Sequence, residues 1–358
     1  MSFIKNLKVI DLSTVLAGPS VGMFFAELGA CVTKVEHPTH KDVTRTWKLS
    51  TENKKSDVSA YFSSVNYAKE YISLNLSNAT DKKEFLSLIS TADILLMNFK
   101  KGDQEKFNIT DNVLQRINPR LIIGKINGFG TDSDRVAYDL ILQAESGFMS
   151  MNGDAVSPPT KMPVALIDVL AAHQLKEGIL TALLNRTINN LGEIVTVSLY
   201  ESAVSSLVNQ ASNYLMEDFI PQRIGSLHPN IAPYGEIFET KDKKLITFAI
   251  GSQKQFEKLA AILELTHLIS DSRFITNQSR IANRSELKQL LEEKISTLES
   301  ENLLNVCHSK YIPAGEIKNL HDVFQTSLAQ QLIREEIIEG KHTKRVSSIA
   351  FKFENGNH

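Results

Sequence analysis

The sequence predicts an α/β protein with a doubly wound, Rossmann-like large domain and a second, smaller α+β domain. Two observations carry this prediction. Short apolar runs rich in β-branched residues alternate with longer segments of helical period, which is typical of strands and helices wrapped around a parallel sheet. The chain of 358 residues is also longer than one hydrophobic core usually organises.

The elements of the large domain follow in order from these patterns. We expect strands over 7–13, 31–36, 71–76, 93–99, 121–126 and 194–199. A helix is predicted over 18–30, so the first 36 residues contain one βαβ unit. Longer helices are predicted over 168–186 and 198–217. Such a sheet gathers its binding loops at the C-terminal ends of its strands, so the segments that follow the first, second and fourth strands should lie on one rim.

The composition of the sequence changes after residue 216. We expect a large domain over 1–216 and a linker over 217–227, because the stretch around the linker contains three prolines and two glycines. The small domain is predicted over 228–317, where a hairpin-like stretch precedes charged amphipathic helices. The segment 318–358 is expected to return to the large domain.

Charge and composition favour small-molecule chemistry. The chain carries 39 basic and 41 acidic side chains, and this net charge of −2 provides no field for a nucleic acid or an anionic membrane. Cys31 and Cys307 form neither a CxxC pair nor a disulfide framework, which fits a reducing cytoplasm. No apolar stretch reaches the length of a membrane span, and the N-terminus does not resemble an export signal.

Motif searches remove several enzyme classes. The sequence contains no GxxxxGK[ST], HExxH or GxSxG pattern, and its glycines do not follow the dinucleotide fingerprint. The histidines are scattered, and no pair of them at i, i+3 or i+4 with a nearby carboxylate suggests a metal site. His173 is predicted to lie on a helix face without a catalytic role. We therefore expect neither a metal nor a permanently bound cofactor.

Four stretches carry a family resemblance, and they occur in one order along the chain. They are VLAGPSVGMFFAELGACVTKVEHP, AYDLILQAESGFMSMNG, PVALIDVLAAHQLKEGILTALLNR and HPNIAPYGEIFET. Together they resemble the family III CoA-transferases, the superfamily of formyl-CoA transferase and α-methylacyl-CoA racemase. The resemblance runs from about residue 6 to about residue 320. It implies transfer of coenzyme A between acyl-CoA and a small carboxylic acid, in an interlocked homodimer.

Asp168 matches the catalytic aspartate of this family. From the residues alone it could equally cap the helix that it opens, because Asp accepts N–H bonds at helix N-termini and faces the positive end of the dipole. The two roles are compatible. The helix end that stabilises the charge is also expected to keep the carboxylate ionised for nucleophilic attack.

Tyr138 separates the two branches of the superfamily. The racemase branch carries a histidine at this place, whereas transferases commonly carry tyrosine. A tyrosine is a poor proton acceptor at neutral pH, so racemisation lacks its second base. A tyrosine in the core of the domain is the structural alternative. Asp139 and Glu145 are candidates for orienting roles only.

The resemblance also implies a set of residues that bind CoA. A helix N-terminus near Ala17 suits a pyrophosphate, and basic side chains suit the 3′-phosphate. At three positions, Leu16, His37 and Met97, the chain departs from the residues usual in the family. These departures make oxalate or formate a doubtful substrate. The rival functions are an acyl-CoA racemase or epimerase and a CoA-binding protein without turnover. The expected CoA-binding residues are Leu16, Ala17, His37, Leu74, Asn75, Leu76, Asn98, Phe99, Lys100, Lys106, Arg135 and Tyr138.

Overall fold

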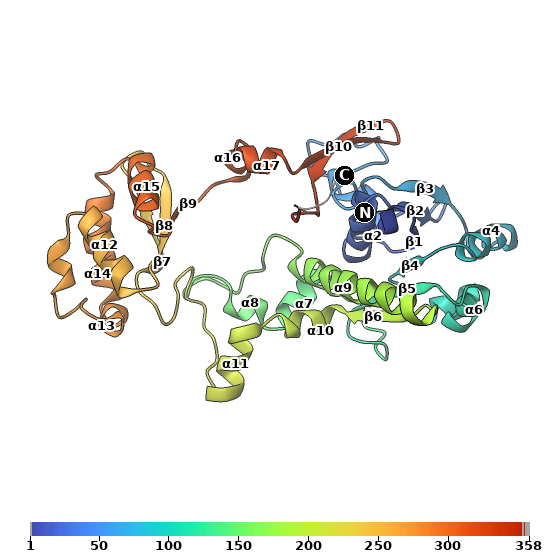
Figure 1. Cartoon of the computed structure of the whole chain (residues 1–358), viewed down its shortest axis with the longest axis horizontal. Coiled ribbons are helices and arrows are strands. Elements are labelled where there is room, and N and C mark those ends of the chain that lie inside the picture. Colours follow the sequence, from blue (N-terminus) through green and yellow to red (C-terminus); the bar gives the residue numbers. More distant parts are fainter. Residues whose placement is uncertain (1, 353, 355–358) are drawn as a thin grey trace. The chain divides into compact units, whose positions relative to one another are not determined.

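The computed structural model describes residues 2–352 and 354, and contacts divide the chain into two compact units (Figure 1). The first unit comprises residues 1–149, 161–220 and 328–358. The second comprises residues 150–160 and 221–327. Residues 218–233, which contain most of the expected linker, form no helix or strand.

A six-stranded parallel sheet forms the centre of the first unit, in the order β3-β2-β1-β4-β5-β6. Strand β1 pairs with β2 on one side and with β4 on the other, so the direction of winding reverses between β1 and β4. This arrangement confirms the predicted α/β class. The strands are β1 (Lys8–Asp11), β2 (Cys31–Glu36), β3 (Glu70–Ser73), β4 (Ile94–Met97), β5 (Ile122–Asn127) and β6 (Ile194–Ser198).

Both faces of this sheet are covered, as the central strand β4 shows, because all four of its residues are apolar and buried. In β4, Ile94 and Leu96 join the core on one face, while Leu95 and Met97 join the core on the other. This alternation is what the pleat imposes on a strand buried on both sides. Helices α2, α9 and α10 contribute to the first core, and α4 and α6 contribute to the second.

The helices of the first unit mostly agree with the expected segments. The predicted single helix over 198–217 is wrong, since it breaks into α10 and α11. The break falls between Ser205 and Val208, where Val208 has a left-handed φ of 45° and the Ser206 hydroxyl donates to the Ser202 carbonyl at 2.7 Å. The helices are α1 (Ser2–Lys5), α2 (Ala17–Glu27), η1 (Val43–Thr46), α3 (Ala60–Ser63), α4 (Ala79–Ile89), α5 (Asp103–Phe107), α6 (Asp111–Ile117), α7 (Asp139–Glu145), α9 (Leu166–Asn189), α10 (Leu199–Ser205) and α11 (Val208–Glu217).

The second unit has a three-stranded antiparallel sheet in the order β7-β8-β9 and a separate apolar core. Its strands are β7 (Tyr234–Glu239), β8 (Leu245–Ala249) and β9 (Ala314–Glu316). Its helices are α12 (Gln253–Ile262), η2 (Thr266–Ile269), α13 (Asn277–Ala282), α14 (Arg284–Ile295), α15 (Ser300–Ser309) and α16 (Leu320–Val323). Helices α8 (Phe148–Met151) and α17 (Ser327–Gln330) lie where the chain passes between the units.

The chain ends with an antiparallel hairpin that belongs to the first unit. Its strands are β10 (Ile333–Ile338) and β11 (Lys341–Val346). The hairpin lies against the segment that follows β2, where Glu339 pairs with Arg45 at 3.0 Å and Lys341 donates to the Val58 carbonyl at 2.8 Å. Residues 353 and 355–358 of the expected return segment lie outside the described part of the chain.

Candidate active site

The C-terminal ends of β1 and β4 bring the first loop and Asn98 together. The Asn98 side chain exchanges two hydrogen bonds with Thr14, accepting from its N–H at 3.0 Å and donating to its carbonyl at 2.9 Å. These two strands flank the point where the winding of the sheet reverses. Ligands of doubly wound proteins bind outside the strand ends at such a point.

The loop between β1 and α2 holds one residue in a strained conformation. Val15 has φ of 74°, a left-handed value that costs a β-branched residue about 1–3 kcal/mol. Its N–H donates to the carboxylate of Asp42, with distances of 3.2 and 3.4 Å to the two oxygens. The loop is therefore fixed by contacts from outside its own segment.

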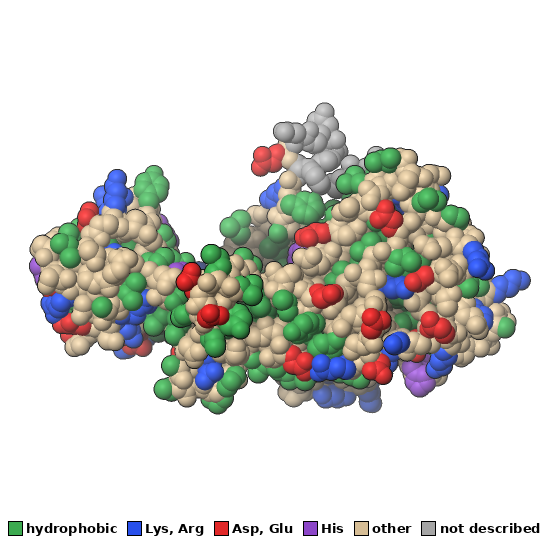
Figure 2. Space-filling view, turned by 90° about the horizontal axis from the view of Figure 1, so that it is seen from below, with side chains coloured by type: hydrophobic (Ala, Val, Ile, Leu, Met, Phe, Trp, Pro, Cys, Tyr) green, Lys and Arg blue, Asp and Glu red, His purple; other side chains and the backbone are tan. Residues whose placement is uncertain are grey.

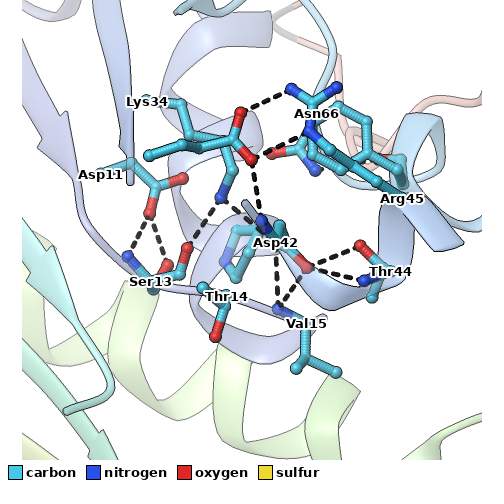
Figure 3. A network of polar contacts seen from close by, with 12 residues as sticks. Asp11, Ser13, Thr14, Val15, Lys34, Asp42, Thr44, Arg45 and Asn66 are labelled. Carbon is cyan, nitrogen blue, oxygen red and sulfur yellow. Dashed lines mark hydrogen bonds and ion pairs between the residues drawn. The ribbon is translucent and has the colours of Figure 1, made fainter. Parts of the chain in front are cut away.

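A set of buried charges lies beneath this loop (Figure 3). Lys34 donates to the Ser13 carbonyl at 2.7 Å and pairs with Asp42 at 3.4 Å. Asp11 pairs with Lys69 at 2.8 Å and accepts from the Ser13 hydroxyl at 2.5 Å. Burial would raise the pKa of Asp11, but the charges of the two lysines hold it below its ordinary value. The carboxylate is therefore ionised in the core of the domain.

Helix α2 starts where the loop ends, with Leu16 at its N-cap and Ala17 as its first residue. Pro19 fits the first turn because its missing N–H would have no helical partner there. A Cβ on Gly18 would lie 2.3 Å from the Cβ of Ser13, so only glycine allows this close packing. No side chain of the described chain caps the helix, which leaves its first N–H groups for a ligand.

Asp168 lies in the first turn of α9 and is almost buried, with 8% of its surface exposed. Burial, together with the negative charge of Asp139, raises the pKa of Asp168 to about 7. This pKa does not agree with the expectation that the helix end keeps the carboxylate ionised, because burial and a like charge both favour its protonated form. The N-cap is Ala165, and no side chain of the described residues caps it.

Asp139 performs the nearest equivalent of capping at this helix. Its Oδ1 accepts from the Ile167 N–H at 2.8 Å, so an α7 side chain satisfies a free donor of α9. Gln143 donates to the other Asp139 oxygen at 2.6 Å and accepts from the Met162 N–H at 2.8 Å. These contacts tie the segment before α9 to α7 and leave the carboxylate of Asp168 outside the hydrogen-bond network.

The charge of Asp168 also acts on Tyr61, a residue that no sequence pattern singled out. Burial and the negative charge of Asp168 raise the pKa of Tyr61 to about 12, and the charges of Asp139 and Asp42 act in the same direction. Its ring meets Trp47 edge-on at 5.1 Å. Tyr61 and Trp47 lie on separate short helical segments, so no periodicity or motif spacing links them in the sequence.

Tyr138 is the N-cap residue of α7, immediately before Asp139. Its side chain is 52% exposed, which excludes the alternative of a core tyrosine. Arg135 pairs with Glu145 at 2.6 Å and lies 4.0 Å from the ring centroid of Phe129. A phosphate at Arg135 would therefore compete with an existing ion pair.

The remaining expected CoA-binding residues differ in the chemical groups that they present to a ligand. Nδ1 of His37 accepts from the N–H groups of Thr39 and His40, so the proton of a neutral ring is on Nε2 and can be donated to a phosphate. Lys100 and Lys106 are exposed.

Other expected contacts are limited by burial. The side chains of Leu74 and Leu76 lie in the core, and the Leu74 N–H donates to the Glu36 carbonyl at 2.9 Å. Asn75 between them is half-buried, and its N–H donates to Asp81 at 2.8 Å. Phe99 packs partly against the same core and contacts Phe107 at 5.8 Å.

The described residues contain neither a candidate metal site nor a candidate membrane-spanning helix. No group of three or more His, Cys, Asp or Glu side chains there is arranged to hold a metal ion. In that same part of the chain, no helix combines the length and apolar character needed to cross a membrane.

Comparisons with known proteins agree with this geometry. Residues 4–357 match the model of CoA-transferase family III. The chain is 33% identical to a succinate–glutarate CoA-transferase of Agrobacterium fabrum, covering 90% of this chain and 81% of the relative. It is also 33% identical to an acetyl-CoA:oxalate CoA-transferase of Acetobacter aceti, covering 92% and 85%.

A solved structure is similar to this chain in both fold and sequence. The crystal structure of a CAIB/BAIF family protein from Brucella suis is 32% identical and has a TM-score of 0.85, covering 98% of this chain and 93% of the other. The chain therefore belongs to CoA-transferase family III, and it transfers coenzyme A between an acyl-CoA and a carboxylic acid.

Proposed function

We propose that Asp168 is the covalent carrier of this reaction, first of the acyl group and then of CoA. The observation that carries the proposal is its environment. The carboxylate is almost buried, its pKa is raised to about 7, and no cation or capping contact occupies it among the described residues. A perturbed, unpaired carboxylate at a ligand-binding edge is the pattern of a reactive group.

The reaction proceeds as a series of acyl transfers. The Asp168 carboxylate attacks the acyl-CoA carbonyl, forms a mixed anhydride and expels CoA thiolate. The thiolate attacks the aspartyl carbonyl, which gives an aspartyl-CoA thioester and releases the first acid. The incoming carboxylate attacks this thioester to form a second anhydride, again expelling the thiolate. The thiolate then takes the new acyl group and restores the free aspartate.

Each step develops negative charge on a carbonyl oxygen, which N–H donors stabilise. At the start of α9, Asp139 already accepts the Ile167 N–H. The Leu166 N–H donates to the Val164 carbonyl at 2.8 Å and the Val169 N–H to the Ala165 carbonyl at 3.1 Å, so we assign this task to the Asp168 N–H. Asp139 itself contributes by orienting the helix and by raising the pKa of Asp168.

CoA is proposed to bind across the reversal point between β1 and β4. The uncapped start of α2 at Leu16 and Ala17 meets the pyrophosphate, while Asn98 holds the loop beside it. The exposed Lys100 and Lys106 supply positive charge for the 3′-phosphate. Calorimetry with CoA, comparing the wild type with Lys100→Ala and Lys106→Ala, measures their share.

The acceptor is proposed to be a small dicarboxylic acid. The names of two relatives specify succinate, glutarate and oxalate, all of which are dicarboxylates. Leu16, His37 and Met97 still argue against oxalate for this chain. Incubation of succinyl-CoA or acetyl-CoA with a panel of dicarboxylates, with mass detection of new thioesters, identifies the pair.

Substitution of Asp168 tests the covalent role. Asp168→Asn keeps the shape but removes the nucleophile, so transfer should fall by on the order of 10³-fold or more while CoA binding changes little. Wild-type enzyme incubated with acyl-CoA and then with hydroxylamine should be modified at this residue. Near-wild-type exchange by the asparagine variant would contradict the mechanism.

Two measurements distinguish CoA transfer from the rival functions. A binding protein without turnover would form no aspartyl-CoA adduct with any acyl-CoA. A racemase would exchange the α-proton of a branched acyl-CoA with solvent deuterium, and Tyr138 in place of a histidine argues against that activity.

We also propose a cytoplasmic homodimer, interlocked as the family resemblance implies. Large apolar side chains are exposed on α9 and α11, and Figure 2 shows hydrophobic side chains gathered where α11 reaches the surface. Exposed apolar surface of this kind is typical of a subunit interface. These side chains are Leu184, Ile188, Val208, Tyr214, Leu215 and Met216.

A further inference from the structure

Asp42 and Lys34 are fully buried charges that the proposed acyl transfers do not use. Both side chains have 0% exposed surface, and both contact the loop between β1 and α2. Lys34 bonds the Ser13 carbonyl, and Asp42 accepts the Val15 N–H. Burying two charges is costly, and an ion pair offsets that cost only partly.

The contacts of Asp42 explain why a charged carboxylate is needed. Its Oδ1 accepts from the Thr44 N–H at 3.0 Å and from the Thr44 hydroxyl at 2.7 Å, which fixes the rotation of the carboxylate. Its Oδ2 is then the oxygen nearest to Val15 and also the one that pairs with Lys34. An amide in this place would direct N–H donors at the Val15 N–H and at an ammonium group.

The contacts continue from Asp42 to the C-terminal hairpin. The Asp42 N–H donates to Glu36 at 3.0 Å, and Glu36 pairs with Arg45. Burial would raise the pKa of Glu36, but the hydrogen bond from Arg45 holds it below its ordinary value. Arg45 in turn pairs with Glu339 at 3.0 Å. The loop is thus held by a series of ionised groups that ends on β10–β11.

We propose that Asp42 and Lys34 are positioning residues that hold Val15 in its left-handed conformation and thereby place Leu16 and Ala17 for CoA. This inference rests on the proposed CoA-binding role of those two residues. It predicts that loss of the Asp42 charge weakens acyl-CoA binding without impairing acyl transfer at Asp168.

The test compares two aspartates that make the same kinds of contact at opposite ends of the sheet. Asp93 accepts the Lys8 N–H at 2.8 Å and pairs with Arg186 at 2.9 Å, but it lies at the amino end of β4. Asp42→Asn should raise the KM for acyl-CoA and the Kd for CoA at least about tenfold, with kcat little changed. Asp93→Asn should leave both constants within about twofold of the wild type.

Val15→Gly provides a rescue that a general loss of stability would not show. Glycine adopts a positive φ without strain, so the loop keeps its conformation with less help from Asp42. Asp42→Asn combined with Val15→Gly should therefore recover most of the lost CoA affinity. A rise in KM that the glycine does not reverse would refute positioning through Val15.

Calorimetry with CoA separates failure of this inference from failure of the proposed function. If the wild type does not bind CoA, the proposed site itself is wrong. If the wild type binds and Asp42→Asn binds equally well, only the positioning role is wrong. Should Asp42→Asn fail to fold, Asp42→Glu retains the charge opposite Lys34 but moves the carboxylate, and an unchanged Kd in that folded variant overturns the inference.

Discussion

Asp168→Asn should stabilise the folded protein increasingly as the pH rises, although it abolishes transfer. The pKa of Asp168 is raised from 3.8 to about 7 in the folded state. The folded value lies above the unfolded one, so its contribution to stability is complete below pH 3.8 and is lost as the pH rises to about 7. Above pH 7 the wild type carries a buried, ionised carboxylate that the asparagine variant lacks.

The size of the effect follows from the two pKa values. One pH unit between them corresponds to about 1.4 kcal/mol. Between pH 5 and pH 8 the free energy of unfolding of the wild type should therefore fall relative to the variant by about 3 kcal/mol, all of it below about pH 7. Contacts that asparagine makes or loses are the same at both pH values, so they cancel in this comparison.

Urea unfolding of both proteins at pH 5 and pH 8, at one protein concentration, measures the difference. A fixed concentration is needed because dimerisation contributes to apparent stability. A helix cap would give another result, since asparagine caps about as well as aspartate and the ionised form would be the favoured one. A difference that stays constant with pH, or that grows in favour of the wild type, would refute the assignment of a raised pKa.

Three further outcomes are expected. Asp139→Asn removes the like charge but not the burial, and burial is the larger cause of the raised pKa of Asp168. The midpoint of the pH profile of kcat/KM should therefore fall from near 7 by less than about 1.5 pH units. An unchanged midpoint would exclude Asp139 as a cause of the raised pKa. Dilution to nanomolar concentration should give no compact monomer in light scattering, because interlocked chains separate only on unfolding. Activity should survive a chelator and exhaustive dialysis, and recovery on adding a divalent metal after a loss would contradict the expected absence of a metal.

The large domain was predictable because its elements have strong local signals. The predicted strand over 31–36 coincides with β2, and the predicted strand over 194–199 exceeds β6 by one residue. Both are β-branched runs with turns beside them. The break after α10 was missed because no glycine or proline marks it in the sequence, and only the structure shows the left-handed φ of Val208.

The support of the first loop could not be predicted, because its contacts are non-local. Asp42 follows Val15 by 27 residues and lies in a segment with no periodic pattern. Tyr61 was missed for the same reason. By contrast, Leu16, Ala17 and Asn98 could be placed on one rim, since strand order alone brings the ends of β1 and β4 together.

Two aspartates in this domain show how surroundings assign a role to the same side chain. Asp42 faces a buried lysine and accepts the N–H groups of Val15 and Thr44, so its contacts suit it to holding a backbone. Asp168 faces a like charge and no cation, so its carboxylate gains little from remaining ionised. Attack on a thioester removes that charge by forming a neutral anhydride. In the proposed mechanism the first chemical step therefore relieves the unfavourable surroundings of Asp168, and the paired surroundings of Asp42 offer no comparable gain.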